Sequence, residues 1–106
     1  MCGIAGYVNL DSSRPAELEV VRAMTRAIVH RGPDDEGFHV DGNLGLAHRR
    51  LAILDLTAAG RQPMSNEDGS VWIVYNGQLY GFQSARDWLT GRGHRFTFLV
   101  WPTCRE

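Results

Sequence analysis

The residue best suited to chemistry lies at the start of the chain, where Cys2 follows the initiator Met1 and opens the segment Cys-Gly-Ile-Ala-Gly. Removal of Met1 would leave a single residue that carries both a nucleophilic sulfur and a free α-amine. An α-amine titrates at about 7.7–8.0 and a free thiol at about 8.5, so the amine can act as a base for its own thiol. Cys2 alone could therefore supply a nucleophile and its general base. The alternative for Cys2 taken in isolation is a small buried apolar residue.

The elements that would position Cys2 are short strands and helices separated by glycine-containing turns. Strands are predicted over 3–10, 36–40, 44–53 and 70–75, and helices over 15–29 and 82–90. The turn Asp41-Gly42-Asn43 is a hairpin signal between two of the strands. We expect Gly32 to close the first helix in a left-handed conformation, and residues 55–65 to form a loop.

Composition limits the class of protein. The chain has 106 residues, 43% of them apolar and 22% charged, which favours one globular domain. Its 11 basic and 12 acidic side chains nearly cancel, so no nucleic-acid partner is predicted. No apolar run reaches the ~20 residues of a membrane span, and the first residues lack a secretory signal. We therefore expect no membrane partner and a cytoplasmic location.

The four histidines do not indicate a metal site. Their spacing fits no zinc pattern, and the two cysteines, Cys2 and Cys104, are too far apart in the sequence to complete one. Lone histidines are more often packed or surface residues, so no metal is predicted. The histidines are His30, His39, His48 and His94.

Further segments of the sequence share their residues with one family. They are His-Arg-Gly-Pro-Asp-Asp-Glu-Gly at 30–37, Ala-His-Arg-Arg-Leu-Ala-Ile-Leu-Asp-Leu at 47–56, Gln-Pro-Met at 62–64 and Tyr-Asn-Gly-Gln-Leu-Tyr at 75–80. Together with the N-terminal segment they closely resemble the glutamine-hydrolysing asparagine synthetases and, more broadly, the class II glutamine amidotransferases. Within the class II amidotransferases, the motifs differ between subfamilies at Pro33-Asp34-Asp35 and at Arg50-Leu51. At both places the sequence resembles the asparagine synthetases more than glucosamine-6-phosphate synthase or phosphoribosylpyrophosphate amidotransferase.

The resemblance implies a fold and a reaction. The fold would be α+β, a partial N-terminal-nucleophile hydrolase α/β/β/α sandwich with antiparallel sheets. The reaction would be hydrolysis of glutamine through a thioester on Cys2, with the ammonia used by a full-length parent for ATP-dependent amidation of aspartate. ATP and Mg²⁺ are expected only in the synthetase domain of that parent, so this chain needs no cofactor. Glutamine is the expected ligand, and a synthetase domain or a completing polypeptide is the expected partner.

The resemblance also assigns roles to individual residues. The Asn76 side chain and the Gly77 backbone N–H match the oxyanion hole, which needs preorganised donors; the alternative for Asn-Gly is a plain turn. Arg50 matches the residue that binds the α-carboxylate of glutamine, a task for a planar bidentate donor. Leu51 and Ile53 match positions that line the same pocket, although apolar strand residues could equally belong to the core. Arg31, Gly32 and Asp34 would shape the loop around the nucleophile, which is a structural and not a catalytic role.

The sequence departs from the family pattern at two single positions, Gln78 and Gly81, and over residues 97–106. Gln78 replaces the usual glutamate that holds the substrate ammonium, and an amide brings no charge to that contact. Gly81 replaces the usual asparagine that would cap the next helix. Residues 97–106 match nothing in the family, so the expected organisation is an incomplete amidotransferase domain over 2–96 followed by an atypical tail.

Three interpretations of function stay open from the sequence. The first is the glutaminase half of an asparagine synthetase. The second is a catalytically dead truncated remnant, or an interaction module completed by a partner, since the apolar run over 96–101 would need neighbours on both faces. The third is a parent enzyme that amidates another carboxylate.

Overall fold

A three-stranded antiparallel sheet carries the N-terminal half of the chain in the order β1-β3-β2. The structure is a computed structural model that describes residues 2–51, 60–77 and 79–96. The strands are β1 (Gly3–Val8), β2 (Asp35–Asp41) and β3 (Leu44–Arg50). β3 is central, pairing with β1 from Gly3 opposite Arg49 to Val8 opposite Leu44. It pairs on its other side with β2, from Asp35 opposite Arg50 to Asp41 opposite Leu44.

One helix covers a face of this sheet. α1 (Leu18–Ala27) packs against β1, β2 and β3, and a single 3-10 turn, η1 (Val29–Arg31), leads out of it. Val21 of α1 is 0% exposed and sits directly over Gly45 of β3, where a Cβ would lie only 2.6 Å from Val21 Cγ2. The absence of a side chain at Gly45 therefore lets the helix approach the central strand.

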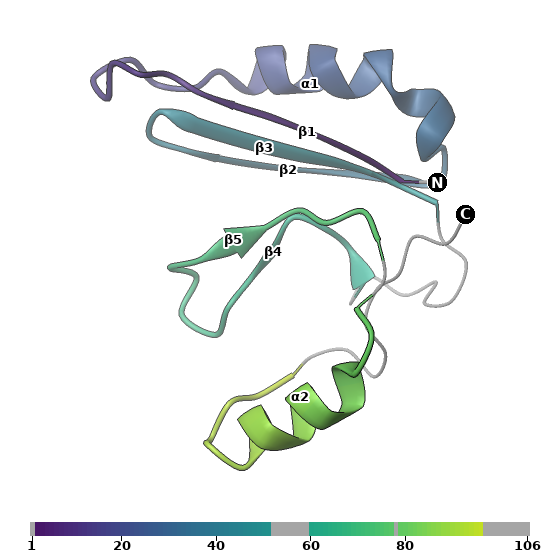
Figure 1. Ribbon diagram of the computed structural model, residues 1–106. Coiled ribbons are helices and arrows are strands. Elements are labelled where there is room, and N and C mark those ends of the chain that lie inside the picture. The colour runs from purple at the N-terminus through teal and green to yellow at the C-terminus, as the bar shows by residue number, and fades with distance from the viewer. Residues whose placement is uncertain (1, 52–59, 78, 97–106) are drawn as a thin grey trace.

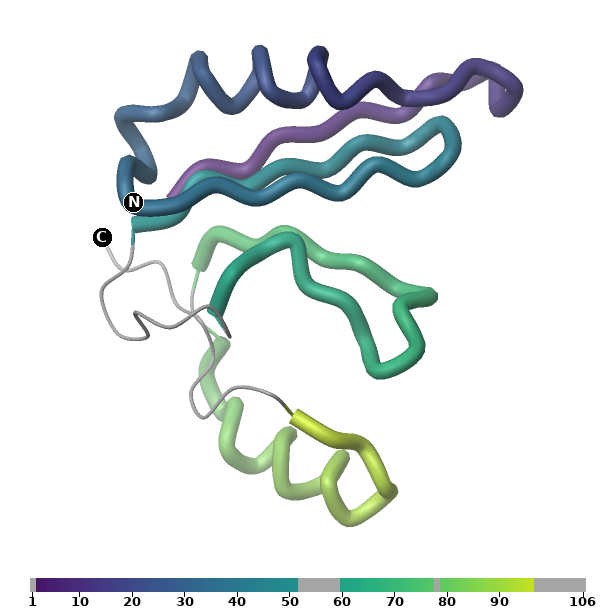
Figure 2. Tube along the Cα trace, turned by 180° about the vertical axis from the view of Figure 1, so that it is seen from behind, coloured from purple at the N-terminus to yellow at the C-terminus, as the bar shows by residue number. Residues whose placement is uncertain are grey.

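The rest of the described chain lies on the opposite side of the sheet. A two-stranded antiparallel sheet is formed by β4 (Met64–Ser65) and β5 (Trp72–Ile73), and α2 (Phe82–Thr90) follows it. Figure 1 shows the order α1, three-stranded sheet, β4–β5 and α2 from top to bottom, and Figure 2 shows the same order from behind. The two sheets are joined by His39 of β2 and Trp72 of β5, whose rings stack with centroids 3.7 Å apart.

The predicted elements compare well with those observed. The helix expected over 82–90 is found at Phe82–Thr90, and the strand expected over 36–40 is one residue longer at each end, Asp35–Asp41. The other expected strands and the first helix are present with shorter bounds among the described residues, and positions 52–53 of the strand expected over 44–53 lie outside those residues. Gly42 takes φ +53° in the predicted hairpin turn between β2 and β3. The α+β expectation is confirmed at the level of mixed helices and antiparallel sheets.

Two local predictions are wrong. Gly32 has φ −150°, so it does not close α1 in a left-handed conformation; the helix ends at Ala27 and η1 intervenes. The loop expected over 55–65 contains the short strand Met64–Ser65, which pairs with Trp72–Ile73. Strand pairing is a tertiary contact that local turn signals do not contain. The apolar run over 97–101 lies outside the described residues.

Candidate active site

Cys2 lies at the end of the sheet where β1 begins. It is 0% exposed, and the backbone N–H of Leu51 donates a hydrogen bond to its Sγ at 3.2 Å. The Leu51 carbonyl oxygen lies 3.8 Å from the same sulfur. Cys2 and Leu51 are thus brought together by the β1–β3 pairing that starts one residue further along, at Gly3 and Arg49.

Arg50 is the last residue of β3 and lies at the same end of the sheet. It is 7% exposed, which is unusual for an arginine and requires that its charge be compensated. It pairs in register with Asp35 of β2, and its carbonyl oxygen accepts the backbone N–H of Asp34 at 3.0 Å. Burial would raise the pKa of Asp35, but the hydrogen bond from Arg61 and the charges of Arg61 and Arg50 lower it. The Arg50 guanidinium therefore belongs to the residue next to Arg49, which is the partner of Gly3 in the β1–β3 pairing.

A buried polar junction lies behind Arg50. His48 is 1% exposed and Gln62 is 3% exposed. The Gln62 Oε1 accepts the backbone N–H of Tyr75 at 2.6 Å. Burial of the imidazole lowers the pKa of His48 from its usual 6.5 to about 4, and the charge of Arg50 acts in the same direction. A hydrogen bond with the backbone of Tyr75 and the charge of Asp35 act in the opposite direction.

Asn76 and Gly77 follow directly from this junction. Gly77 has φ +158°, and a Cβ there would lie 2.8 Å from the hydroxyl oxygen of Tyr75, so the Tyr75 side chain folds back over Gly77. Val74, the residue before Tyr75, lines the same apolar cavity as Ile4 and Leu46 of the three-stranded sheet. The Val74–Gly77 segment therefore runs against the first sheet, with Tyr75 hydrogen-bonded to His48 of β3.

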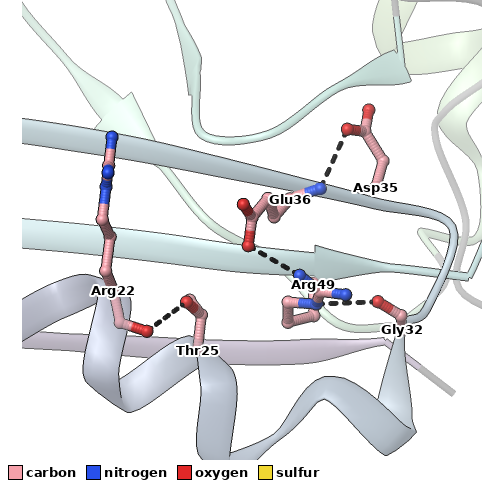
Figure 3. A network of polar contacts seen from close by, with 6 residues as sticks. All are labelled: Arg22, Thr25, Gly32, Asp35, Glu36 and Arg49. Atoms are coloured by element: carbon pink, nitrogen blue, oxygen red, sulfur yellow. Dashed lines mark hydrogen bonds and ion pairs between the residues drawn. The ribbon is translucent and has the colours of Figure 1, made fainter.

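η1 contacts the residue before β1, and Gly32, which follows η1, contacts β3. The Arg31 Nε donates to the Cys2 carbonyl oxygen at 3.2 Å, and the Arg49 Nε donates to the Gly32 carbonyl oxygen at 2.9 Å. Figure 3 shows Arg49 between Gly32 on one side and Glu36 on the other, with the Arg49–Glu36 ion pair at 2.6 Å. These contacts tie η1, β2 and β3 together beside the nucleophile.

The predicted site residues thus fall into two groups. Cys2, Arg50 and Leu51 gather at one end of the first sheet, and Asn76 and Gly77 follow a residue that is bonded to that sheet through His48. Ile53 and Gln78 lie outside the described residues. The oxyanion-hole and pocket roles stay predictions.

Two polar residues of the site were not identified from the sequence. The sequence alone indicates an ordinary packed or surface histidine at His48, and it gives Gln62 no role within the Gln-Pro-Met motif. The available signal was their presence inside motifs of the chain, since a polar residue within an apolar strand segment such as 44–53 has to be satisfied when buried.

Within residues 2–51, 60–77 and 79–96, no three His, Cys, Asp or Glu side chains are grouped so that they could hold a metal ion. No helix in the same ranges is both long enough and apolar enough to cross a membrane.

The sequence matches one family model and several curated proteins. A family model described as the glutamine amidotransferase domain matches residues 1–98. The chain is 46% identical over 88 residues to "Asparagine synthetase [glutamine-hydrolyzing] 2" of Bacillus subtilis, a match that covers 81% of this chain and 12% of that protein. It is 38% identical over 98 residues to "Asparagine synthetase [glutamine-hydrolyzing] 1" of the same organism, a match that covers 91% of this chain and 15% of that protein. The nodule asparagine synthetase of Pisum sativum is 38% identical to this chain over 96 residues, a match that covers 91% of this chain and 16% of that protein.

These relatives are much longer than this chain, which spans between 12% and 16% of their length. The match is nevertheless continuous from the nucleophile segment to the end of α2, so it includes every described residue of the candidate site. The chain belongs to the glutamine amidotransferase domain family.

Proposed function

We propose that this chain is the glutamine-hydrolysing part of an asparagine synthetase and that Cys2 is its nucleophile. The observation that carries the proposal is the position of the Cys2 sulfur, which is within hydrogen-bond distance of the Leu51 amide at the end of the sheet that also holds Arg50. The family match and the similarity to glutamine-hydrolysing asparagine synthetases supply the substrate class.

The reaction follows from the chemistry of a terminal cysteine. After removal of Met1, the free α-amine of Cys2 takes the thiol proton and the sulfur attacks the side-chain carbonyl carbon of glutamine. The C–N bond of the resulting tetrahedral adduct breaks, the α-amine returns the proton to the leaving nitrogen, and ammonia and a thioester are formed. Water then hydrolyses the thioester, which gives glutamate and restores the thiol.

The neighbouring residues have distinct tasks in this reaction. Arg50 would bind the α-carboxylate of glutamine through its planar guanidinium, and the Leu51 and Ile53 positions would line the pocket. The Asn76 side-chain amide and the Gly77 N–H would stabilise the oxyanion, each such donor being typically worth about 10²–10³ in rate. Gln78 would replace a charged contact with the substrate ammonium by a neutral one, and we expect weaker glutamine binding by at most ~1.5–3 kcal/mol.

The ammonia would serve an ATP-dependent amidation of aspartate in a synthetase domain, with ATP and Mg²⁺ bound there. The fold that fits this assignment is the N-terminal-nucleophile α/β/β/α sandwich, of which residues 2–96 would form a part and 97–106 an atypical tail. The layer order in Figure 1 is consistent with that sandwich. A cytoplasmic location goes with the same assignment, and a parent that amidates a different carboxylate would use the same glutaminase chemistry.

A second candidate function is an interaction module that a partner completes. It is favoured by the β1 strand, which pairs only with β3 among the described strands and leaves Ile4 50% and Val8 55% exposed. An apolar strand edge of this kind is suited to pairing with further strands. The same exposed edge is expected if a glutaminase chain requires a completing polypeptide. The fold is therefore compatible with both functions, and a measurement of glutaminase activity distinguishes them.

The test is covalent labelling of the nucleophile. The chain is purified under a reductant, its N-terminus is identified by mass spectrometry, and it is incubated with a diazo-ketone analogue of glutamine. The expected result is a single adduct on Cys2, prevented by excess glutamine, together with release of glutamate from glutamine. A Cys2→Ala variant is the control, and equal labelling of that variant would contradict the proposal. A correctly processed, cooperatively folded chain that takes up no label would favour the interaction module.

A further inference from the structure

The backbone of Tyr75 is held by a buried side chain from the preceding segment. Gln62 is 3% exposed and accepts the Tyr75 N–H through its Oε1 at 2.6 Å. Tyr75 lies after β5, where no ladder bond to a strand supplies this hydrogen bond within the described residues. A buried N–H left unsatisfied would cost free energy, so the Gln62 side chain takes over the part of a neighbouring strand.

The same peptide segment is held from the side of the first sheet by His48. The imidazole is 1% exposed and hydrogen-bonds the backbone of Tyr75. Because this bond favours the protonated ring, the ring is its donor and the Tyr75 carbonyl oxygen its acceptor. His48 lies two residues before Arg50 on β3, so the two residues are about 7 Å apart along the strand. The hydrogen bond to His48 therefore holds the Tyr75 backbone close to Arg50.

Gln62 is itself fixed to the sheet. Gly37 of β2 lies opposite His48 of β3, and a Cβ at Gly37 would overlap the Gln62 carbonyl oxygen. The Gln62 main chain therefore rests directly on β2, at the same level at which His48 projects from β3. The Tyr75 backbone is thus hydrogen-bonded to two side chains, one from Gln62, whose main chain packs on β2, and one from His48 of the adjacent strand β3.

We propose that Gln62 and His48 are positioning residues that clamp the Tyr75 peptide and so fix Asn76 and Gly77 relative to Cys2 and Arg50. The inference rests on the proposed function, because Asn76 and Gly77 are assigned to the oxyanion hole there. Neither Gln62 nor His48 needs to touch glutamine. Their effect is on geometry, and a displacement of about 1 Å in a catalytic group can cost about 10²-fold in rate.

A first experiment tests whether the clamp exists. Amide hydrogen exchange is measured by NMR on wild type, Gln62→Met and His48→Phe, variants that remove the acceptor and the donor at similar volume. The clamp predicts that exchange of the Tyr75 and Gly77 amides accelerates at least tenfold in each variant, while the amide of Ala47, in the middle of β3, is unchanged. Gln62→Glu keeps an acceptor at the same place and is expected to protect Tyr75 as the wild type does.

A second experiment tests whether the clamp positions the catalytic groups. Under reducing conditions, steady-state glutamate release is measured for the same variants, and the rate of Cys2 alkylation by iodoacetamide is measured alongside. Positioning of the oxyanion hole predicts a kcat about 10²-fold lower in Gln62→Met and His48→Phe, a KM for glutamine within about threefold of wild type, unchanged alkylation, and recovery of kcat in Gln62→Glu.

The outcomes separate the clamp from the glutaminase assignment. If wild type releases no glutamate in a Cys2-dependent way, the proposed function fails, and hydrogen exchange alone decides whether Gln62 and His48 hold Tyr75. Equal exchange at Tyr75 in all proteins would overturn the clamp, as would faster exchange with an unchanged kcat. Should Gln62→Met not fold, His48→Phe and Gln62→Glu carry both measurements.

Discussion

Gly32 and Arg49 meet backbone to backbone beside the nucleophile. A Cβ at Gly32 would overlap the carbonyl group of Arg49, and the Arg49 Nε returns to donate a hydrogen bond to the Gly32 carbonyl oxygen at 2.9 Å. Figure 3 shows this closed contact, with Glu36 on the far side of the guanidinium. The loop that follows η1 therefore packs on β3 immediately before Arg50. Arg31, the last residue of η1, hydrogen-bonds the Cys2 carbonyl oxygen.

The Gly32–Arg49 contact predicts that Gly32→Ala lowers the free energy of unfolding through a steric clash with the Arg49 backbone. The backbone of Gly32, at φ −150°, is extended and open to any residue, so strain in φ plays no part. The added methyl group must push the loop away from β3, and overpacking of this kind typically costs about 1–3 kcal/mol. Urea unfolding should report that loss of free energy of unfolding.

Gly91→Ala is the matched control for that prediction. Gly91 has helical backbone angles, and a Cβ there would meet its nearest neighbour at an ordinary 3.5 Å. The substitution should leave stability unchanged or raise it by about 0.4–1 kcal/mol through the unfolded chain. Equal losses in the two variants would show that the loop around the nucleophile is not tightly packed on β3.

Arg50→Lys is predicted to raise the KM for glutamine about 10–100-fold with a smaller change in kcat. Lysine keeps the positive charge but loses the two parallel N–H donors that match a carboxylate. Arg49→Lys is the paired control, since Arg49 already binds Glu36 and the Gly32 carbonyl oxygen. It should lower stability and leave the KM within about twofold. A KM that rises in the Arg49 variant and not in the Arg50 variant would reverse the assignment.

Much of the fold could be predicted because its elements carry local signals. The helix at Phe82–Thr90 and the hairpin around Gly42 follow from periodicity and turn chemistry, which act over a few residues. The strand at Met64–Ser65 is not predicted from the sequence, because a two-residue strand has no period and depends on its pairing with Trp72–Ile73. The ending of α1 was misjudged because Gly32 is required for its small size against Arg49 and not for a left-handed conformation.

The site could be predicted as a set of residues but not as an arrangement. Cys2, Arg50 and Leu51 were identified from motifs, and the pairing of β1 with β3 explains why distant motifs meet. Gln62 and His48 had no assigned role, because their importance comes from hydrogen bonds to the Tyr75 backbone that no sequence pattern encodes. A buried polar side chain takes its meaning from its partner, which only the fold supplies.

The stacked rings of His39 and Trp72 predict an energetic coupling between the two sheets. The rings are nearly parallel, at 12°, with centroids 3.7 Å apart. A double-mutant cycle of His39→Ala and Trp72→Ala should give a coupling of about 0.5–1.5 kcal/mol, the range found for aromatic pairs. Replacing His39 by Phe should keep most of it. Additive losses in the cycle would mean that the sheets are held together elsewhere.

Acid sensitivity should come in part from His48. Its pKa is about 4 in the folded chain because of burial, compared with about 6.5 when unfolded. Above pH 6.5 the ring is neutral in both states and its contribution to stability is complete. As the pH falls below 6.5 the unfolded chain binds a proton that the folded chain does not, so stability decreases until the folded ring is protonated too, near pH 4.

Between pH 7 and pH 5 this single group should reduce the free energy of unfolding by about 2 kcal/mol. Urea unfolding of wild type and His48→Phe at both pH values isolates the effect, since the carboxylates titrate equally in the two proteins. The variant is expected to start from a lower stability at pH 7, having lost the bond to Tyr75, and to change less on acidification. Parallel pH profiles would mean that His48 is solvated in the folded chain, and the buried junction behind Arg50 would then have to be abandoned.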